Sequence, residues 1–140
     1  MILRFTPSAL QAATEHCEAG YPHEVTGLLA GDRATWTVRE VLPLLNENTE
    51  NPARRYTVTA PAMMKAQRRI RELGLEEVGY YHSHPQHPAQ YSDEDRDKAW
   101  PNMAYPIFSV LEGAVADIRA WRLRDDRSAM DEIDIESTED

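Results

Sequence analysis

Hydrophobic and polar positions repeat with two different periods along the chain, and these periods divide it into short elements. Residues 1–5 are mostly apolar and predict a first strand. Thr6 and Pro7 then have the order of an N-cap and a first helical position, and Gly20 is the predicted stop of that helix. Its inner face is predicted from four residues at helical spacing: Leu10, Ala13, Thr14 and Cys17.

The middle of the chain is predicted to alternate between extended and helical segments. Strands are expected at four short runs of apolar, aromatic or β-branched residues: 25–30, 35–45, 56–58 and 76–84. Gly31 and Asp32 predict a turn after the first run, and the polar residues 46–54 predict an exposed loop. A helix is expected over 60–73, ended by Gly74.

The last part of the chain is predicted to be richer in strands. Residues 85–90 contain two prolines and predict a loop, and Ser92 is expected to begin a helix of about two to three turns. Two strands, 107–111 and 116–123, are predicted around a hairpin turn at Glu112-Gly113. Together these elements predict an α/β fold in which helices pack on a central mixed sheet.

The acidic charge of the chain is concentrated at its C-terminal end. The formal net charge is −9, and residues 125–140 hold eight acidic residues and one basic residue, so residues 1–124 carry only −2. This pattern predicts one domain over 1–124 and an acidic, partly disordered tail over 125–140. A short terminal strand at Ile133 and Ile135 is the alternative. No basic patch is concentrated enough to indicate a nucleic-acid partner.

Membrane and disulfide classes are not expected. The apolar runs are too short to span a bilayer, and the N-terminus lacks the basic-then-apolar order of a signal peptide. Cys17 is the only cysteine, so it cannot form an internal disulfide, and a zinc site built on paired cysteines is excluded. This cysteine usage is typical of the reducing cytoplasm, which is the predicted location. No pattern in the sequence indicates an oligomeric state.

His82 and His84 are the first candidates for chemistry. Side chains alternate faces along a strand, so two histidines two residues apart point the same way and can reach one metal ion. Asp95, from the start of the next helix, is a candidate third ligand. Three protein ligands and one position left to water are typical of a catalytic zinc site. His87 falls in the loop that follows, where the alternatives are a place at the metal entrance or simple exposure.

Ser92 and Asp95 also have a purely structural interpretation. The spacing Ser-x-x-Asp is that of a capping box, which stabilises a helix start without any chemistry. The two interpretations are compatible, because a cap fixes the carboxylate in the first turn, facing back towards the end of the preceding strand. Glu24 is a candidate base for a metal site, yet a carboxylate at the edge of an apolar run is more often a surface residue.

The combined motif closely resembles that of the JAMM (MPN-plus) metalloproteases, in their small stand-alone prokaryotic form. It consists of Glu-Val-Thr-Gly-Leu-Leu-Ala-Gly over 24–31, Gly-Tyr-Tyr-His-Ser-His-Pro over 79–85, and Ser-x-x-Asp six residues later. The resemblance implies an MPN-type mixed sheet sandwiched by helices, with a cytidine-deaminase-like outline. It also implies one zinc ion per chain, bound by His82, His84 and Asp95. Two positions depart from the family's pattern: Thr26 replaces a common cysteine and Tyr91 a common proline.

The same resemblance implies the remaining roles. Glu24 would be the general acid/base, and Ser92 would hydrogen-bond the oxyanion or the water. The chain has no insertion long enough for an elaborate ubiquitin-binding surface. The expected activity is therefore hydrolysis of a peptide or isopeptide bond at the C-terminal Gly-Gly of a ubiquitin-like, sulfur-carrier-type protein or its conjugate. A general zinc peptidase and a non-catalytic MPN scaffold remain the alternatives.

Two other zinc hydrolase classes fit less well. His82-x-His84-x-x-His87 is similar to the start of the metallo-β-lactamase motif, but Gln86 replaces its aspartate and no later histidine completes two sites. A zinc deaminase would need a Pro-Cys-x-x-Cys segment, which a chain with one cysteine cannot supply.

Overall fold

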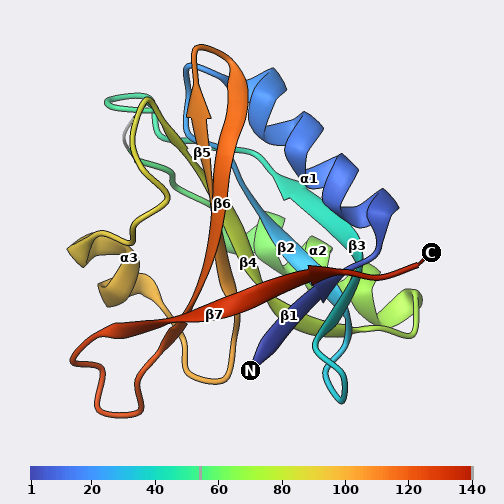
Figure 1. Cartoon of the computed structure of the whole chain (residues 1–140). Coiled ribbons are helices and arrows are strands. Elements are labelled where there is room, and N and C mark those ends of the chain that lie inside the picture. The colour runs from blue at the N-terminus through green and yellow to red at the C-terminus, as the bar shows by residue number, and fades with distance from the viewer. Residues whose placement is uncertain (54, 140) are drawn as a thin grey trace.

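The computed structural model describes residues 1–53 and 55–139, and the strands among them hydrogen-bond into one closed barrel (Figure 1). Their order around the barrel is β1-β3-β2-β4-β5-β6-β7. The strands are β1 Ile2–Phe5, β2 Thr26–Asp32, β3 Thr37–Leu44, β4 Glu76–Pro85, β5 Tyr105–Leu111, β6 Ala114–Leu123 and β7 Met130–Ser137. The helices are α1 Pro7–Gly20, α2 Ala60–Glu72 and α3 Asp93–Lys98.

The two longer helices cover opposite faces of β2. Side chains alternate along a strand, so Leu28 and Leu29 point to different sides. Leu29 packs in the cluster that contains Cys17 of α1, whereas Leu28 packs in the cluster that contains Ile70 of α2. Every residue of β2 before Asp32 is therefore buried. The predicted mixed sheet sandwiched by helices is confirmed, and its closure into a barrel is a feature that the hydrophobic pattern did not predict.

The helix starts follow the local sequence signals. Thr6 caps α1 by accepting a hydrogen bond from the Ala9 amide at 3.3 Å, and Pro7 is its first residue. Gly74 follows α2 with a left-handed φ of +71°, a conformation that glycine adopts without steric cost. At the predicted hairpin, Glu112 and Gly113 have positive φ angles of 51° and 82° and join β5 to β6. No described helix is long and apolar enough to cross a lipid bilayer.

The C-terminal segment differs from its predicted disorder. Residues 130–137 form β7, which pairs antiparallel with β6 and parallel with β1 and so closes the barrel. Met130 and Ile133 are buried, while the acidic residues of β7 are exposed. The alternative of a terminal strand therefore describes this segment, because Met130, Ile133 and the partly buried Ile135 anchor it despite its charge.

Three other predicted elements differ from the structure in their extent or pairing. Residues 56–58 belong to no strand and pair with no described strand. Gly31 and Asp32 belong to β2, and the turn comes after them. Helix α3 has only six residues, fewer than two turns, because its chain leaves the helix at Ala99 before Pro101. Figure 1 shows α3 apart from α1 and α2, near the turn that joins β6 to β7.

Candidate metal centre

The end of β4 presents two imidazoles on one face. His82 and His84 are two residues apart in the strand, and their Nε2 atoms are 3.1 Å from each other. His82 is 2% exposed, and the side chain of His84 is 13% exposed. The alternation of side chains along a strand, from which the pairing was predicted, explains why both rings face the same space.

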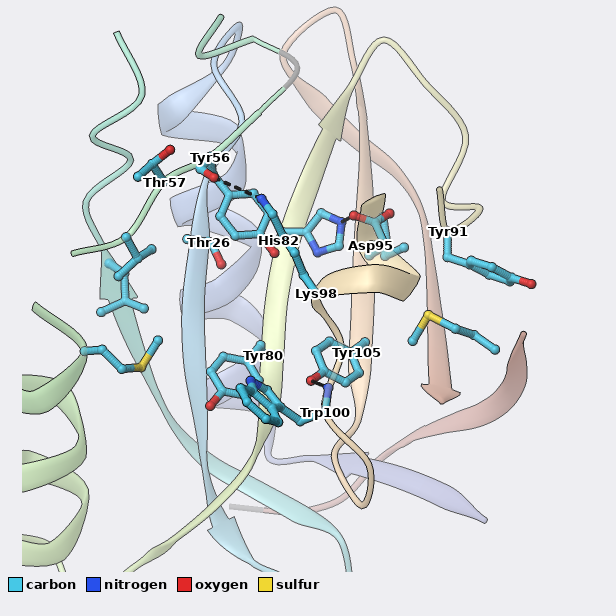
Figure 2. A pocket seen from close by; sticks show the side chains of 15 residues that line it. Thr26, Tyr56, Thr57, Tyr80, His82, Tyr91, Asp95, Lys98, Trp100 and Tyr105 are labelled. Carbon is cyan, nitrogen blue, oxygen red and sulfur yellow. Dashed lines mark hydrogen bonds and ion pairs between the residues drawn. The ribbon is translucent and has the colours of Figure 1, made fainter. Parts of the chain in front are cut away.

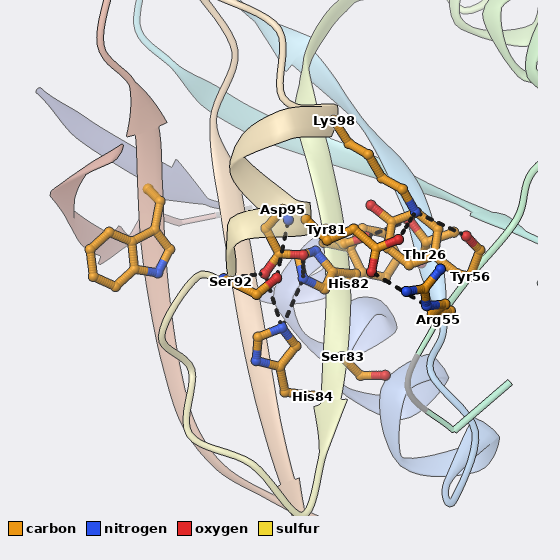
Figure 3. A network of polar contacts seen from close by, with 12 residues as sticks. Thr26, Arg55, Tyr56, Tyr81, His82, Ser83, His84, Ser92, Asp95 and Lys98 are labelled. Atoms are coloured by element: carbon orange, nitrogen blue, oxygen red, sulfur yellow. Dashed lines mark hydrogen bonds and ion pairs between the residues drawn. The ribbon is translucent and has the colours of Figure 1, made fainter. Parts of the chain in front are cut away.

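Asp95 reaches the same space from α3, as Figure 3 shows. Its Oδ1 lies 3.1 Å from His82 Nε2, and its Oδ2 lies 3.2 Å from His84 Nε2. The capping box is present as well: Ser92 Oγ accepts from the Asp95 amide at 3.1 Å, and Asp95 Oδ2 accepts from the Ser92 amide at 2.9 Å. The cap thus fixes the carboxylate where it faces the two histidines, so both interpretations of this spacing hold.

The donor set fits a zinc ion. Among the described residues, His82, His84 and Asp95 form the one group of ligand atoms close enough to hold a metal. In a tetrahedral site with bonds of about 2.0–2.1 Å, neighbouring ligand atoms lie about 3.3–3.4 Å apart. The two histidine Nε2 atoms are 3.1 Å apart, and each lies 3.1–3.2 Å from one of the two Asp95 carboxylate oxygens, which is close to this ligand spacing. His84 Nδ1 lies 2.9 Å from the Pro88 carbonyl, and donation to that oxygen leaves the Nε2 lone pair facing the group.

Electrostatics keeps Asp95 ionised. Burial alone raises the pKa of this carboxyl, but its interactions with His82, His84 and the Ser92 amide outweigh burial and lower it. For His84, burial lowers the pKa, and the contacts with Asp95 and the Pro88 carbonyl raise it overall. A buried carboxylate that stays charged supplies the negative charge that balances a bound divalent cation.

Glu24 is brought to this centre by strand pairing. Thr26 of β2 lies opposite His82 of β4, and the Val25 carbonyl accepts a hydrogen bond from the Ser83 amide at 3.0 Å. Continuing that antiparallel register places Glu24 opposite His84. Glu24 is only 5% exposed, and burial, reinforced by the charge of Asp95 and opposed by that of Lys98, raises its pKa to about 9. A cation bound beside it would lower this pKa again.

Asn46 is a site residue that the sequence did not single out. Its Nδ2 donates to the Glu24 carbonyl at 2.8 Å and to the Arg55 carbonyl at 2.9 Å. Its Oδ1 accepts from the Thr57 amide at 3.1 Å. This one side chain therefore ties the segment that carries Glu24 to the loop beyond β3. The available signal was an asparagine directly after a strand, where its side chain commonly satisfies loop backbone groups.

The centre lies between two cavities. One, of about 350 Å³, is mainly apolar and aromatic and is shown in Figure 2. The other, of about 330 Å³, is more polar and includes Glu24, Ser92 and His84 in its wall. Asp95 lines both cavities, as do three residues without an assigned role from the sequence: Tyr56, Tyr91 and Lys98.

Tyr56 separates the two cavities beside the metal centre. Its ring lies 5.5 Å from the ring of His82. Lys98 Nζ lies 4.3 Å from the Tyr56 ring centroid and donates to the Tyr56 carbonyl at 3.2 Å (Figure 2). Lys98 also pairs with Glu94 one turn earlier, at 3.3 Å. That i,i+4 spacing of opposite charges was the one sequence signal for Lys98.

His87 is not one of the converging residues. It is exposed, it lines the polar cavity, and its carbonyl accepts a hydrogen bond from Ser109 Oγ at 2.6 Å. Of the two alternatives for this residue, the structure therefore places it at the edge of the polar cavity, outside the group of His82, His84 and Asp95.

Comparisons with known proteins agree with this geometry. The family model described as prokaryotic homologs of the JAB domain matches residues 6–124. The desampylase of Haloferax volcanii is 36% identical over 103 residues, which cover 73% of each chain. A probable TtuB-protein conjugate cleaving protease of Thermus thermophilus is 32% identical over 110 residues, covering 79% of this chain and 72% of the relative.

A solved structure gives the same fold. The crystal structure of a JAB1/MPN domain protein from Archaeoglobus fulgidus superposes with a TM-score of 0.63 at 18% sequence identity. The match covers 98% of this chain and 100% of that one. It therefore includes β7 and the turn before it, which lie beyond the residues matched by the family model.

Proposed function

The chain belongs to the family of prokaryotic JAB-domain proteins, and from this premise we propose that it is a zinc metalloprotease of the JAMM type. The substrate proposed is the C-terminal Gly-Gly of a ubiquitin-like, sulfur-carrier-type protein, joined to another group by a peptide or isopeptide bond. The observation that carries the proposal is the convergence of His82, His84 and Asp95 beside the buried Glu24. Relatives named for desampylation and for cleavage of TtuB conjugates support this substrate class.

One zinc ion per chain is proposed, held by His82 Nε2, His84 Nε2 and a carboxylate oxygen of Asp95. Zinc bound there would supply a Lewis acid that polarises the scissile carbonyl and lowers the pKa of water. Residues of the chain hold the proposed zinc ligands in place. The Pro88 carbonyl fixes the orientation of the His84 ring, and the Ser92 cap fixes the carboxylate.

Glu24 is proposed to move the proton. Its carboxylate would accept a proton from the attacking water and deliver it to the leaving amine nitrogen, so that one group serves both halves of the hydrolysis. Ser92 Oγ accepts from the Asp95 amide, which leaves its hydroxyl hydrogen free to donate to the developing oxyanion. Both residues line the polar cavity, so both can act on the same side of the scissile bond.

This arrangement orients the substrate. The leaving amine must lie within reach of Glu24, and so it would occupy the polar cavity, while the acyl tail would occupy the apolar cavity. Glycine at the end of the tail lets the backbone approach the metal closely. Residues 56–58 line the apolar cavity, so the tail would lie along them.

Two alternatives are set apart by activity. A non-catalytic scaffold would bind zinc or a carrier without cleavage, and a general peptidase would cleave tails that lack glycine.

The absence of a nucleic-acid partner stays a prediction from the charge pattern, and a cytoplasmic location stays a prediction from the single cysteine.

The test is cleavage of candidate ubiquitin-like carriers fused through their C-terminal Gly-Gly to a reporter. Zinc-loaded protein should release a carrier that ends at the second glycine, as read by mass spectrometry. A matched fusion with valine in place of that glycine should be cut far more slowly. Equal cutting of both fusions would indicate a general peptidase, and no product from any fusion would indicate a scaffold.

A further inference from the structure

Helix α3 presents a structural problem that its own sequence does not solve. It has six residues and no buried side chain, yet it holds Asp95 oxygens 3.1 and 3.2 Å from two histidine nitrogens. Helices this short are unstable alone, because the cost of nucleation is recovered only over many residues. The capping box fixes the first turn, so contacts elsewhere must fix the last.

Arg127 makes those contacts from the turn between β6 and β7. Its guanidinium donates from Nη1 to the Ala99 carbonyl at 3.0 Å and from Nη2 to the Asp97 carbonyl at 3.1 Å. A longer contact of 3.5 Å joins Nη2 to the Arg96 carbonyl. The Asp97 and Ala99 carbonyls lie at the end of the helix, where the last carbonyls lack partners within the helix and form the negative end of its dipole; the Arg96 carbonyl also accepts from the Ala99 amide. The planar fork of arginine can satisfy several of them together.

The turn that carries Arg127 is itself ordered. The Arg127 amide donates to the Arg124 carbonyl at 2.8 Å, and Asp126 Oδ1 accepts from the Ser128 amide at 3.0 Å. Arg127 has a left-handed φ of +62°. Glycine, asparagine and aspartate are more usual in this conformation than a long side chain such as arginine. Next to its contacts, Ala99 is buried and the Trp100 amide donates to the Tyr105 hydroxyl. The end of α3 is thus fastened to the barrel.

We propose that Arg127 is a positioning residue for Asp95: it fastens the C-terminal end of α3 so that the carboxylate stays in line with His82 and His84. The inference rests on the proposed metal site. It assigns part of that site's support to the C-terminal segment, beyond residue 124 where the family match ends. The acidic segment 125–140 then contributes to the metal centre through its one basic residue.

The chain offers a matched pair of variants. Asparagine tolerates a left-handed φ, so Arg127→Asn removes the guanidinium while keeping the backbone of the turn. Arg124→Asn removes the same charge from the same turn, but Arg124 pairs with Asp131 on β7 and not with α3. Arg127→Lys keeps the charge and loses the fork.

Zinc affinity, measured by competition with a chelator, is the first readout. Arg127→Asn should weaken binding by about tenfold, the lower end of the effect of groups that support metal ligands. Arg127→Lys should restore part of the loss, and Arg124→Asn should bind as the parent does. Equal affinity in Arg127→Asn and Arg124→Asn would overturn the proposal.

Hydrogen exchange in the metal-free protein is the second readout, and it needs no metal site. The Arg96 and Ala99 amides, which bond to the Ser92 and Arg96 carbonyls, should exchange faster in Arg127→Asn alone. The Leu10 amide in α1 reports whether the whole fold is kept. Unchanged α3 exchange would refute the role of Arg127. The proposed metal site is tested separately by Asp95→Ala. If that variant binds zinc as tightly as the parent protein does, the metal site is wrong whatever the role of Arg127.

Discussion

Glu24 and the three convergent side chains are all nearly buried, but only Glu24 stands outside the group of ligand atoms. Its raised pKa reflects the burial of the carboxyl and the nearby charge of Asp95. Such an environment favours a group that exchanges a proton during turnover over one that stays permanently ionised.

The first prediction is that Glu24→Gln keeps the zinc and loses most turnover. The amide has nearly the same shape but cannot carry the proton, so kcat should fall by about a hundredfold or more. Zinc content by metal analysis and kcat on a cleavable carrier fusion measure the two effects. The same substitution at the exposed Glu72 of α2 is the control. Loss of the metal, or full activity, would show that Glu24 has another role.

The second prediction separates ligands from their neighbours. The parent protein should bind about one zinc per chain, at about 2.0–2.2 Å from the histidine nitrogens and the carboxylate oxygen. Asp95→Ala should lose most of this zinc, because only two of the three protein ligands, the histidines, would remain. His87→Ala should keep it, because His87 lies outside the convergent group. A crystal structure with zinc bound elsewhere, or metal loss in His87→Ala, would contradict the ligand assignment.

At the scale of elements, the short helix α3 combines two tasks. Its capping box stabilises the helix start, and the same two residues supply the candidate ligand and the candidate oxyanion donor. A substitution of Ser92 therefore changes both the stability of the helix and the proposed catalysis. Its effect must be compared with that of removing an N-cap far from the metal centre.

The third prediction uses that comparison. Ser92→Ala and Thr6→Ala each remove an N-cap, from α3 and α1, and each should lower the free energy of unfolding by about 1 kcal/mol. Only Ser92→Ala should also lower kcat, with zinc retained and a smaller loss than in Glu24→Gln. Urea unfolding and kinetics on the same samples measure both. Equal kcat in the two variants would leave Ser92 with a capping role alone.

Local signals predicted these elements better than their partners. Thr6, Pro7 and Ser92 mark helix starts because a cap acts within four residues of chain. The two histidines of β4 share a face because of strand geometry, and this too was readable. The neighbourhood of Glu24 and His82 was not, since it arises from the pairing of β2 with β4, in which Thr26 and its partner His82 are 55 residues apart in the chain. The hydrogen bonds of Asn46 and the position of Tyr56 between the two cavities likewise depend on contacts with residues that are not neighbours in sequence.

At the scale of the whole molecule, the barrel closes only because β7 joins β6 to β1. Composition predicted the opposite for this segment, since its dense acidic residues resemble those of a disordered tail. The acidic side chains of β7 are exposed and its apolar ones turn inward, so the period of the pattern outweighed its average charge. The same closure gives every described strand a neighbour on each side, which shortens the edges open to unwanted association.

The fourth prediction tests whether β7 belongs to the fold. Ile133 is buried and lies opposite Ala120 of β6, so Ile133→Ala should lower the free energy of unfolding by about 2 kcal/mol or more. Asp134→Ala, at the next and exposed position, should change it little. Urea denaturation of both variants beside the parent measures the difference. If the two variants had equal midpoints, residues 130–137 would not form β7 in solution, and the domain would end near residue 124 as the charge pattern predicts. A large loss for Ile133→Ala alone would instead make the C-terminal strand, and the turn that carries Arg127, part of the structure on which the metal centre depends.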